Sequence, residues 1–261
     1  MSLYSNRTQS GFTLVELAIV LVVVGLIISG VLRGEELLRN VRVTMTIRQV
    51  RSFRAATINF YSMYDALPGD MRSAPSRLPN CNSNSYCMSG DGNGVVGTIT
   101  SGTANTQYGI NAPKVETSMF FKHLALAHYI SSVKAGANPA SDPQWGEIYP
   151  AAKLRGGYNV LHMNEGTLSG KPIKTGLFLR LQNSLGNNAF ASPGGCTVAP
   201  CPFEAVSPRE AWQIDTKMDD GLPEGGLVYA DDQASEGSSG CEGKYDQKAN
   251  GPNCIMFFKI M

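Results

Sequence analysis

The sequence predicts an α+β fold in which a long N-terminal helix, with a membrane-spanning half and an amphipathic half, packs on an antiparallel β-sheet head with large disulfide-bounded loops. Three observations predict it. An apolar run fills residues 12–32, helical periodicity continues beyond that run, and the later sequence alternates short apolar segments with stretches rich in Gly, Pro, Ser and Asn.

The apolar run at residues 12–32 has the length of a membrane-spanning helix. As an α-helix it would reach roughly 31 Å, which matches the hydrocarbon core of a bilayer. The run contains one ionisable residue, Glu16, and burying such a group in an apolar helix is costly. Glu16 therefore predicts a function inside the membrane or in a bundle of helices. An ordinary secretory signal peptide is the alternative, but its cleavage site would follow the apolar block, whereas Gly11 precedes it.

Helical periodicity continues beyond the apolar run to about Tyr64. Apolar residues recur at steps of three and four, as one face of an amphipathic helix requires. The segment Leu67-Pro68-Gly69-Asp70 ends the pattern, because the residue before a proline avoids the helical conformation and glycine permits a turn. The recurring residues are Leu37, Val41, Met45, Val50, Phe53, Thr57, Phe60 and Tyr64.

The segment Gly11-Phe12-Thr13-Leu14-Val15-Glu16-Leu17, followed by AIVLVVVGLIISGVL, resembles the N-terminus of type IV prepilins and type II secretion pseudopilins. The resemblance implies that a prepilin peptidase cuts between Gly11 and Phe12 and methylates the new amine of Phe12. It also implies that Glu16 pairs with the N-terminal amine of a neighbouring subunit and so sets axial register in a filament. A mis-stacked subunit would leave two unpaired charges in an apolar bundle.

The resemblance divides the chain into four parts. Residues 1–11 form a leader that is removed, 12–32 a transmembrane and filament-core helix, 33–66 its amphipathic extension, and 67–261 a globular α+β head. Arg7 is the one cation of the leader and agrees with a cytoplasmic N-terminus. We therefore expect a single-pass protein of the bacterial inner membrane with a periplasmic head, which later enters a surface pilus or a periplasmic pseudopilus.

Six cysteines predict disulfides, because their number is even and the head is expected in an oxidising compartment. Several connectivities are open. Sequential pairing is favoured because short loops close easily and each pair lies within one segment rich in Gly, Pro, Ser and Asn. Metal ligation is the alternative, but no CxxC occurs and His123, His128 and His162 show no ligand spacing with the cysteines. The sequential pairs are Cys81 with Cys87, Cys196 with Cys201, and Cys241 with Cys254.

Alternating apolar residues predict the strands of an antiparallel sheet that lies across the upper half of the long helix. The clearest strand is residues 176–182, in which Leu177, Leu179 and Leu181 alternate with other residues. Further strands of this sheet are expected at 158–163, 227–230 and 254–260, and a short strand is expected at 95–100 within the loop region 71–118.

Two further helices are expected in the head. Apolar residues on one side predict a helix over residues 116–133, in which His123 and His128 pack or face solvent. Ser207 as N-cap, proline at the first helical position and Glu210 at the third predict the start of another helix.

Two acidic segments suggest calcium binding. Asp91-Gly92-Asn93-Gly94 begins like an EF-hand loop, but valine follows and no glutamate stands at the required distance, so a tight turn is the better interpretation. In the helix after Ser207, Asp215 and Asp219 are four residues apart and share a face, with Asp220 adjacent. Pairing with Lys217, capping or solvent exposure is the favoured interpretation of these three carboxylates, and calcium binding is the alternative. No other cofactor is expected.

Composition and motifs favour a structural, non-enzymatic protein. The net charge is +1 and the sequence shows no dense basic surface, so nucleic acid is not expected as a partner. No G-x-S-x-G, H-E-x-x-H or phosphate-binding glycine loop occurs.

The resemblance implies a large-headed or minor pilin that polymerises with itself or other pilins, using an inner-membrane assembly platform and ATPase. Arg33 favours this kind over an abundant shaft subunit, because many major pilins carry a proline there. The alternatives are a type II secretion pseudopilin, a pilus-displayed adhesin whose head loops bind a surface ligand, and a membrane-anchored periplasmic protein that never polymerises.

Overall fold

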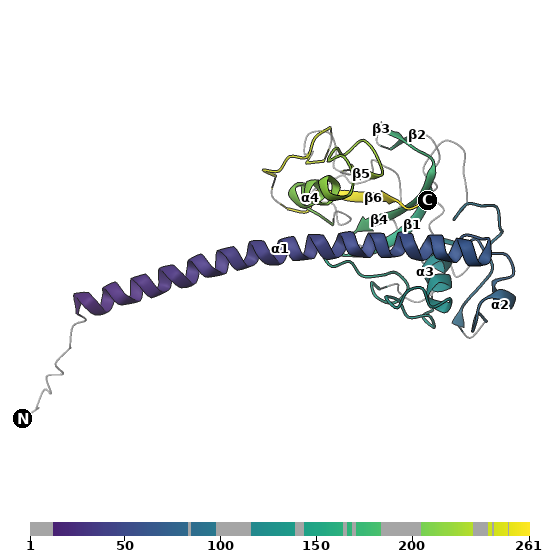
Figure 1. Cartoon of the computed structure of the whole chain (residues 1–261), viewed down its shortest axis with the longest axis horizontal. Helices are drawn as coiled ribbons and strands as arrows, with labels where there is room; N and C mark the ends of the chain where they lie inside the picture. The colour runs from purple at the N-terminus through teal and green to yellow at the C-terminus, as the bar shows by residue number, and fades with distance from the viewer. Residues whose placement is uncertain are drawn as a thin grey trace, which may run out of the picture. The chain divides into compact units, whose positions relative to one another are not determined.

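Figure 1 shows the computed structural model of the chain. The chain contains two compact units, Met1–Arg42 and Val43–Met261. In the first unit the described residues belong almost entirely to the N-terminal part of one helix, which continues into the second unit. The structure describes residues 13–82, 85–97, 116–138, 144–163, 166–168, 171–183, 205–231, 240–241, 243–249 and 251–261.

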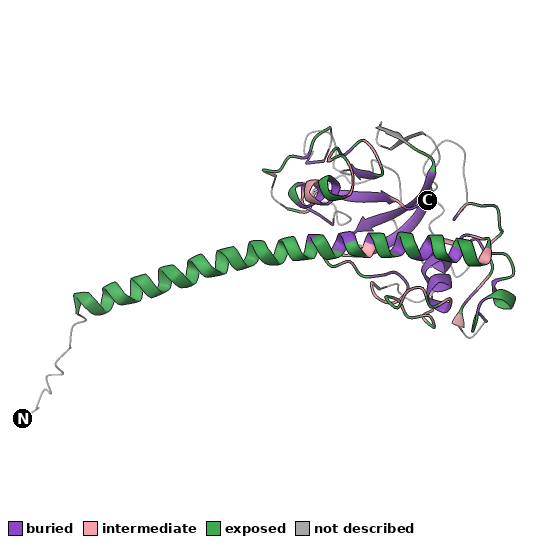
Figure 2. Ribbon diagram, viewed as in Figure 1, coloured by how far each residue is buried: buried purple, intermediate pink, exposed green. Residues whose placement is uncertain are grey.

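Helix α1 (Leu14–Tyr64) runs through 51 residues without a break, which confirms the predicted end near Tyr64. Asp65 ends it, because its backbone takes a left-handed conformation at φ 48° while its amide still donates to the Tyr61 carbonyl. In the first unit every described residue is exposed (Figure 2). Among the described residues, α1 is the one helix long and apolar enough to cross a membrane, judged by length and composition.

Six described strands belong to the second unit: β1 (Gly157–Met163), β2 (Gly166–Leu168), β3 (Lys171–Ile173), β4 (Gly176–Gln182), β5 (Val228–Asp231) and β6 (Ile255–Lys259). Four of them form an antiparallel sheet in the order β1-β4-β6-β5. Their predicted positions are confirmed to within one residue at each end. Strands β2 and β3 pair separately, and the sequence pattern did not reveal them.

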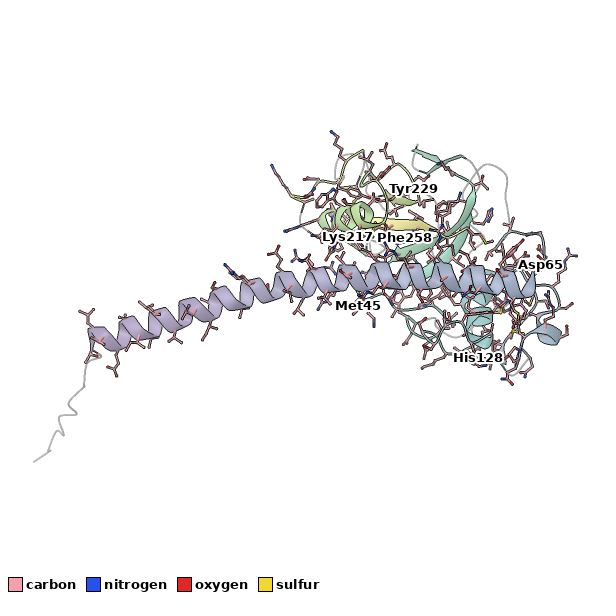
Figure 3. All side chains as sticks on the ribbon, viewed as in Figure 1. Met45, Asp65, His128, Lys217, Tyr229 and Phe258 are labelled. Carbon is pink, nitrogen blue, oxygen red and sulfur yellow. A yellow bond between two sulfur atoms is a disulfide. The ribbon has the colours of Figure 1, made fainter. Side chains whose placement is uncertain are left out.

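Strand β4 is buried on both faces of the sheet. Leu177, Leu179 and Leu181 lie in the main core together with the buried face of α1. Phe178 lies on the other face, in a smaller apolar cluster that includes Tyr229 of β5. Tyr229 is labelled in Figure 3. All seven residues of β4 are buried, so the alternation in its sequence separates two buried faces. The other members of the smaller cluster are Leu161, Met163, Ile255 and Phe257.

The part of α1 in the second unit closes the main-core face of the sheet. Phe53 is 3% exposed, and its ring lies 5.3 Å from the Tyr158 ring and 5.6 Å from the Phe121 ring in edge-to-face geometry. These contacts join α1 to β1 and to helix α3 (Glu116–Leu126). The buried positions of α1 recur at helical spacing, as predicted: Val43, Thr46, Ile47, Val50, Phe53, Ala56, Thr57 and Phe60.

Helix α3 (Glu116–Leu126) ends before the predicted residue Val133, so that prediction is wrong in its last turns. The Tyr129 amide donates to the Leu124 carbonyl at 2.9 Å, and the His128 amide donates to the Ala125 carbonyl at 3.0 Å. This is a Schellman motif, with His128 in the left-handed position, at φ 61°, that glycine usually occupies. Because no glycine marks this end, periodicity alone could not locate it.

Helix α4 (Pro208–Met218) confirms the predicted capping box. The Glu210 amide donates to Ser207 Oγ at 3.3 Å, and the Ser207 amide donates to Glu210 Oε2 at 2.9 Å. The short helix α2 (Ala74–Arg77) was not predicted.

Two described disulfides follow the sequential pairing: Cys81–Cys87, with Cα atoms 5.0 Å apart, and Cys241–Cys254, with Cα atoms 5.9 Å apart. The third predicted pair, Cys196 and Cys201, lies outside the described residues. Cys254 directly precedes β6, so the second bond fixes the chain at the start of an interior strand.

Replacing Phe53 by alanine should lower the free energy of unfolding of the second unit by about 3–5 kcal/mol, because a buried ring between three elements is lost. Urea denaturation of the full chain in detergent, followed by near-ultraviolet circular dichroism, measures the change. Met63→Ala on the same helix is the control, since Met63 is 71% exposed and should shift stability by less than about 0.5 kcal/mol. Equal losses in the two variants would contradict this packing.

Candidate functional site

The start of α1 gives the carboxylate of Glu16 a partner within its own chain. The Thr13 backbone N–H donates to Glu16 Oε2 at 3.2 Å, and the Thr13 hydroxyl lies 3.2 Å from the same oxygen. The Glu16 N–H donates back to Thr13 Oγ1 at 3.3 Å. This reciprocal arrangement is a capping box, for which T-x-x-E is a sequence signature. This capping box was not predicted from the sequence, because Glu16 was assigned to pairing between subunits.

The apolar segment of α1 from Leu14 to Leu32 has no protein partner among the described residues of the first unit. Its large apolar side chains are between 45% and 89% exposed. Such a surface is stable only in lipid or against other apolar helices. Gly11 and Phe12, the residues predicted to flank the cleavage site, lie outside the described residues.

An acidic cluster in the second unit joins Asp70, Asp91 and Glu116, with one carboxylate oxygen of each within 4.8 Å of the others. The Asn93 and Gly94 amides donate to the two oxygens of Asp70 at 3.0 and 2.8 Å. Both oxygens of Glu116 also accept hydrogen bonds from backbone amides. Burial raises the pKa of Glu116 to about 7 against those hydrogen bonds, and the charges of Asp70 and Asp91 raise it further.

Asp91 Oδ1 accepts a hydrogen bond from the amide of Asn93 at 3.0 Å, which makes an Asx turn where the sequence favours a tight turn. Residues 95–97 then form bends, so the strand predicted at 95–100 is wrong in its described part, and 98–100 lie outside it. Sequence reasoning missed that Asp70 and Glu116 join this turn, because both are distant from it along the chain.

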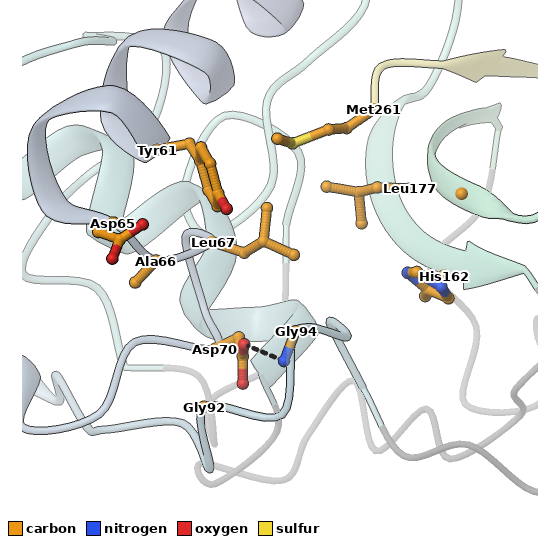
Figure 4. Close-up of a pocket in the computed structure, with 11 residues that line it drawn as sticks. Tyr61, Asp65, Ala66, Leu67, Asp70, Gly92, Gly94, His162, Leu177 and Met261 are labelled. Atoms are coloured by element: carbon orange, nitrogen blue, oxygen red, sulfur yellow. Dashed lines mark hydrogen bonds between the residues drawn. The ribbon is translucent and has the colours of Figure 1, made fainter.

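A cavity of about 340 Å³ lies beside Asp70 (Figure 4). Its walls include Tyr61, Leu177, Met261 and His162. Burial lowers the pKa of His162, and the charge of Lys259 lowers it further. Among the residues that the structure describes, no serine, cysteine or lysine lines this cavity.

His123 is a buried packing residue, in agreement with its prediction, whereas His128 is exposed. The Nδ1 atom of His123 accepts a hydrogen bond from the Gly69 amide at 2.9 Å, and its Nε2 atom lies 2.9 Å from the Met88 carbonyl oxygen. The ring is therefore the neutral Nε2–H tautomer. Burial lowers the pKa of His123 to about 4, against the hydrogen bond to Met88, and the charge of Lys122 lowers it further.

A second acidic cluster joins the calcium candidates Asp215, Asp219 and Asp220 at the C-terminal end of α4, again with carboxylate oxygens within 4.8 Å of one another. The Tyr245 hydroxyl donates to Asp215 Oδ2 at 2.8 Å. The Val228 amide donates to Asp219 Oδ2 at 3.1 Å. The i, i+4 spacing therefore does place Asp215 and Asp219 together, while the approach of Tyr245 could not be read from the sequence.

Residues 6–32 match the family described as the prokaryotic N-terminal methylation motif. The chain is therefore a type IV pilin-like or pseudopilin-like protein with an N-methylation leader. This motif suggests a structural, non-enzymatic protein and agrees with a place in the inner membrane and then in a pilus. The chain matches no curated protein and no solved structure.

Stability should fall more steeply below pH 6.5 in the wild type than in a His123→Gln variant. The pKa of His123 is about 4 in the folded state and 6.5 in its ordinary range, so the unfolded chain binds a proton first as the pH falls. Between pH 7 and pH 5 the wild type should lose about 2 kcal/mol more of its free energy of unfolding than His123→Gln does. Urea denaturation at both pH values measures it, and exposed His128→Gln serves as control. Parallel pH profiles for wild type and His123→Gln would refute the assignment.

Proposed function

We propose that this chain is a structural subunit of a bacterial type IV pilus, of the large-headed or minor kind, which polymerises through α1 after its leader is removed. The observation that carries the proposal is the methylation motif at residues 6–32, which precedes and includes a helical segment exposed along its whole length. That segment needs an apolar environment at every stage, and lipid and then neighbouring α1 helices would supply it.

Cleavage between Gly11 and Phe12 would create a new amine directly before Thr13. The proposal assigns this step to a prepilin peptidase, and glycine suits the residue before the cut because it leaves the backbone unobstructed. The methylated amine would remain cationic, and in a filament it would meet the carboxylate of Glu16 on another subunit.

The capping box explains how Glu16 is accommodated before assembly. In the single chain its carboxylate accepts from the backbone N–H of Thr13, so it is not left without a donor in an apolar helix. A neighbouring ammonium offers a stronger, charge-assisted hydrogen bond, especially in a bundle with little water. On assembly, Glu16 would therefore exchange its hydrogen bond from Thr13 for a pairing with the amine of another subunit. This exchange would lower the free energy only when the subunits are in register.

A type II secretion pseudopilin is the second candidate, because the methylation motif is shared by both systems. The size of the second unit, Val43–Met261, supports the large-headed or minor kind, since it is larger than a compact shaft subunit requires. Labelling of surface fibres, compared with labelling of the periplasm, separates the two.

Replacing Glu16 by alanine should leave the chain in the inner membrane but reduce its incorporation into fibres by about tenfold or more, because the register pairing is lost. Immunoblots of sheared surface material and of the membrane fraction measure the two pools. Glu35→Ala is the matched control, an exposed carboxylate on the same helix outside the apolar segment. Normal fibre incorporation of the Glu16→Ala chain would count decisively against assembly through this residue.

Replacing Gly11 by valine should block removal of the leader, because a branched side chain obstructs entry of the extended backbone into the peptidase. Mass spectrometry of the N-terminal peptide should find a methylated Phe12 in the wild type and an intact leader in the variant. Ser10→Ala is the control and should be processed normally. A wild-type N-terminus located after the apolar segment would identify a secretory signal instead.

A further inference from the structure

The C-terminal end of α4 gathers three carboxylates where a helix is least suited to hold them. Asp215 lies in the last turn, Asp219 is the C-cap and Asp220 follows. The helix dipole places partial negative charge at this end, so each additional anion is destabilising. Lys217 in the same turn is exposed, and among the described residues no ion pair joins any lysine or arginine to these carboxylates.

One oxygen of each carboxylate is held by the protein. Tyr245 holds Asp215 through Oδ2, the Leu227 and Val228 amides hold Asp219 through Oδ2, and the Leu222 amide donates to Asp220 Oδ1 at 2.8 Å. These bonds orient the three groups but leave a second oxygen on each.

Asp215 is the strongest sign that a ligand is required. Its side chain is 0% exposed, and its Oδ1 has no hydrogen-bond partner among the described residues. A buried carboxylate oxygen without a donor or cation is expensive. Burial raises the pKa of Asp215 to about 7, against the hydrogen bond from Tyr245 and the influence of the nearby Gly221 amide, and the charges of Asp220 and Asp219 raise it further.

The loop after α4 is shaped around the same carboxylates. Gly226 has φ +70°, and a Cβ atom there would collide with Asp219 Oδ2. A Cβ atom on Gly225 would lie 2.8 Å from Asp220 Oδ2. Two adjacent glycines therefore let the backbone pass directly against the acidic groups.

We infer that Asp215, Asp219 and Asp220 bind one calcium ion, with the orphan Oδ1 of Asp215 as a ligand. The donors are oxygens only, which selects a hard cation over zinc or copper. Calcium accepts about six to eight oxygens in flexible geometry, whereas magnesium requires a strict octahedron and retains water. A helix end and a glycine loop, which present carboxylates in an irregular arrangement, suit calcium.

The ion would connect three parts of the second unit. Asp215 belongs to α4, Asp219 is bonded to the first residue of β5, and Tyr245 lies within the loop closed by Cys241–Cys254. Calcium would hold these parts together wherever the ion is abundant. This inference does not depend on the proposed pilus function.

The other acidic cluster supplies the comparison. There both oxygens of Asp70 and both oxygens of Glu116 accept backbone amides, so no buried carboxylate oxygen of these two residues is left over. Asp70→Asn is therefore the matched control for a carboxylate change in the second unit.

The test uses the full chain in detergent, stripped with a calcium chelator and then titrated with CaCl₂. Calorimetry should show calcium binding, and saturating calcium should raise the thermal midpoint by about 5 °C or more. Asp215→Asn should abolish the shift. Asp220→Asn should weaken binding at least about tenfold, and it is the variant most certain to fold, because Asp220 is exposed and Asn Oδ1 can still accept from the Leu222 amide. Asp70→Asn should bind as the wild type does.

Absence of calcium binding by the wild type would overturn the inference. So would unchanged affinity in Asp220→Asn, or loss of binding in Asp70→Asn with binding retained in Asp220→Asn. Equal affinity and an equal thermal shift with MgCl₂ would overturn the assignment to calcium. Terbium luminescence, displaced by calcium in the wild type and weaker in Asp220→Asn, gives a second readout that needs no unfolding.

Discussion

Burial of one face of α1 against the sheet is the constraint on which the second unit depends. The leucines of β4 and the ring of Phe53 belong to the same hydrophobic core, and Phe53 contacts β1 and α3. The same helix in the first unit has no such face, because every described residue of it is exposed. One helix therefore carries two kinds of surface, one satisfied within the chain and one that requires an outside partner.

The parts of the fold that follow local periodicity could be predicted from the sequence. Alternation located β4, steps of three and four located the buried face of α1, and the Ser207 capping box located α4. The end of α3 could not be predicted, because His128 replaces the glycine that usually marks a Schellman motif. Strands β2 and β3 are too short, at three residues each, to show a period.

The candidate sites divide in the same way. Spacing within α4 indicated Asp215 and Asp219, and the methylation motif is contiguous in sequence, so both were readable. The approach of Asp70 to Glu116, and of Tyr245 to Asp215, depends on chain segments far apart in sequence. No local sequence pattern reports such contacts. These contacts determine which carboxylate oxygens have hydrogen-bond donors and which have none.

Strand β6 lies inside the sheet, between β4 and β5, although it is the last of the six strands along the chain. β1 and β4 are close in sequence and can pair early, but their partner β6 arrives only after the long intervening segment has been delivered. Until then the hydrogen-bonding edge of β4 is open, as in a nascent sheet prone to wrong pairing. Folding of the second unit would therefore be completed only when this final strand inserts between β4 and β5, since only then is the interior of the sheet closed.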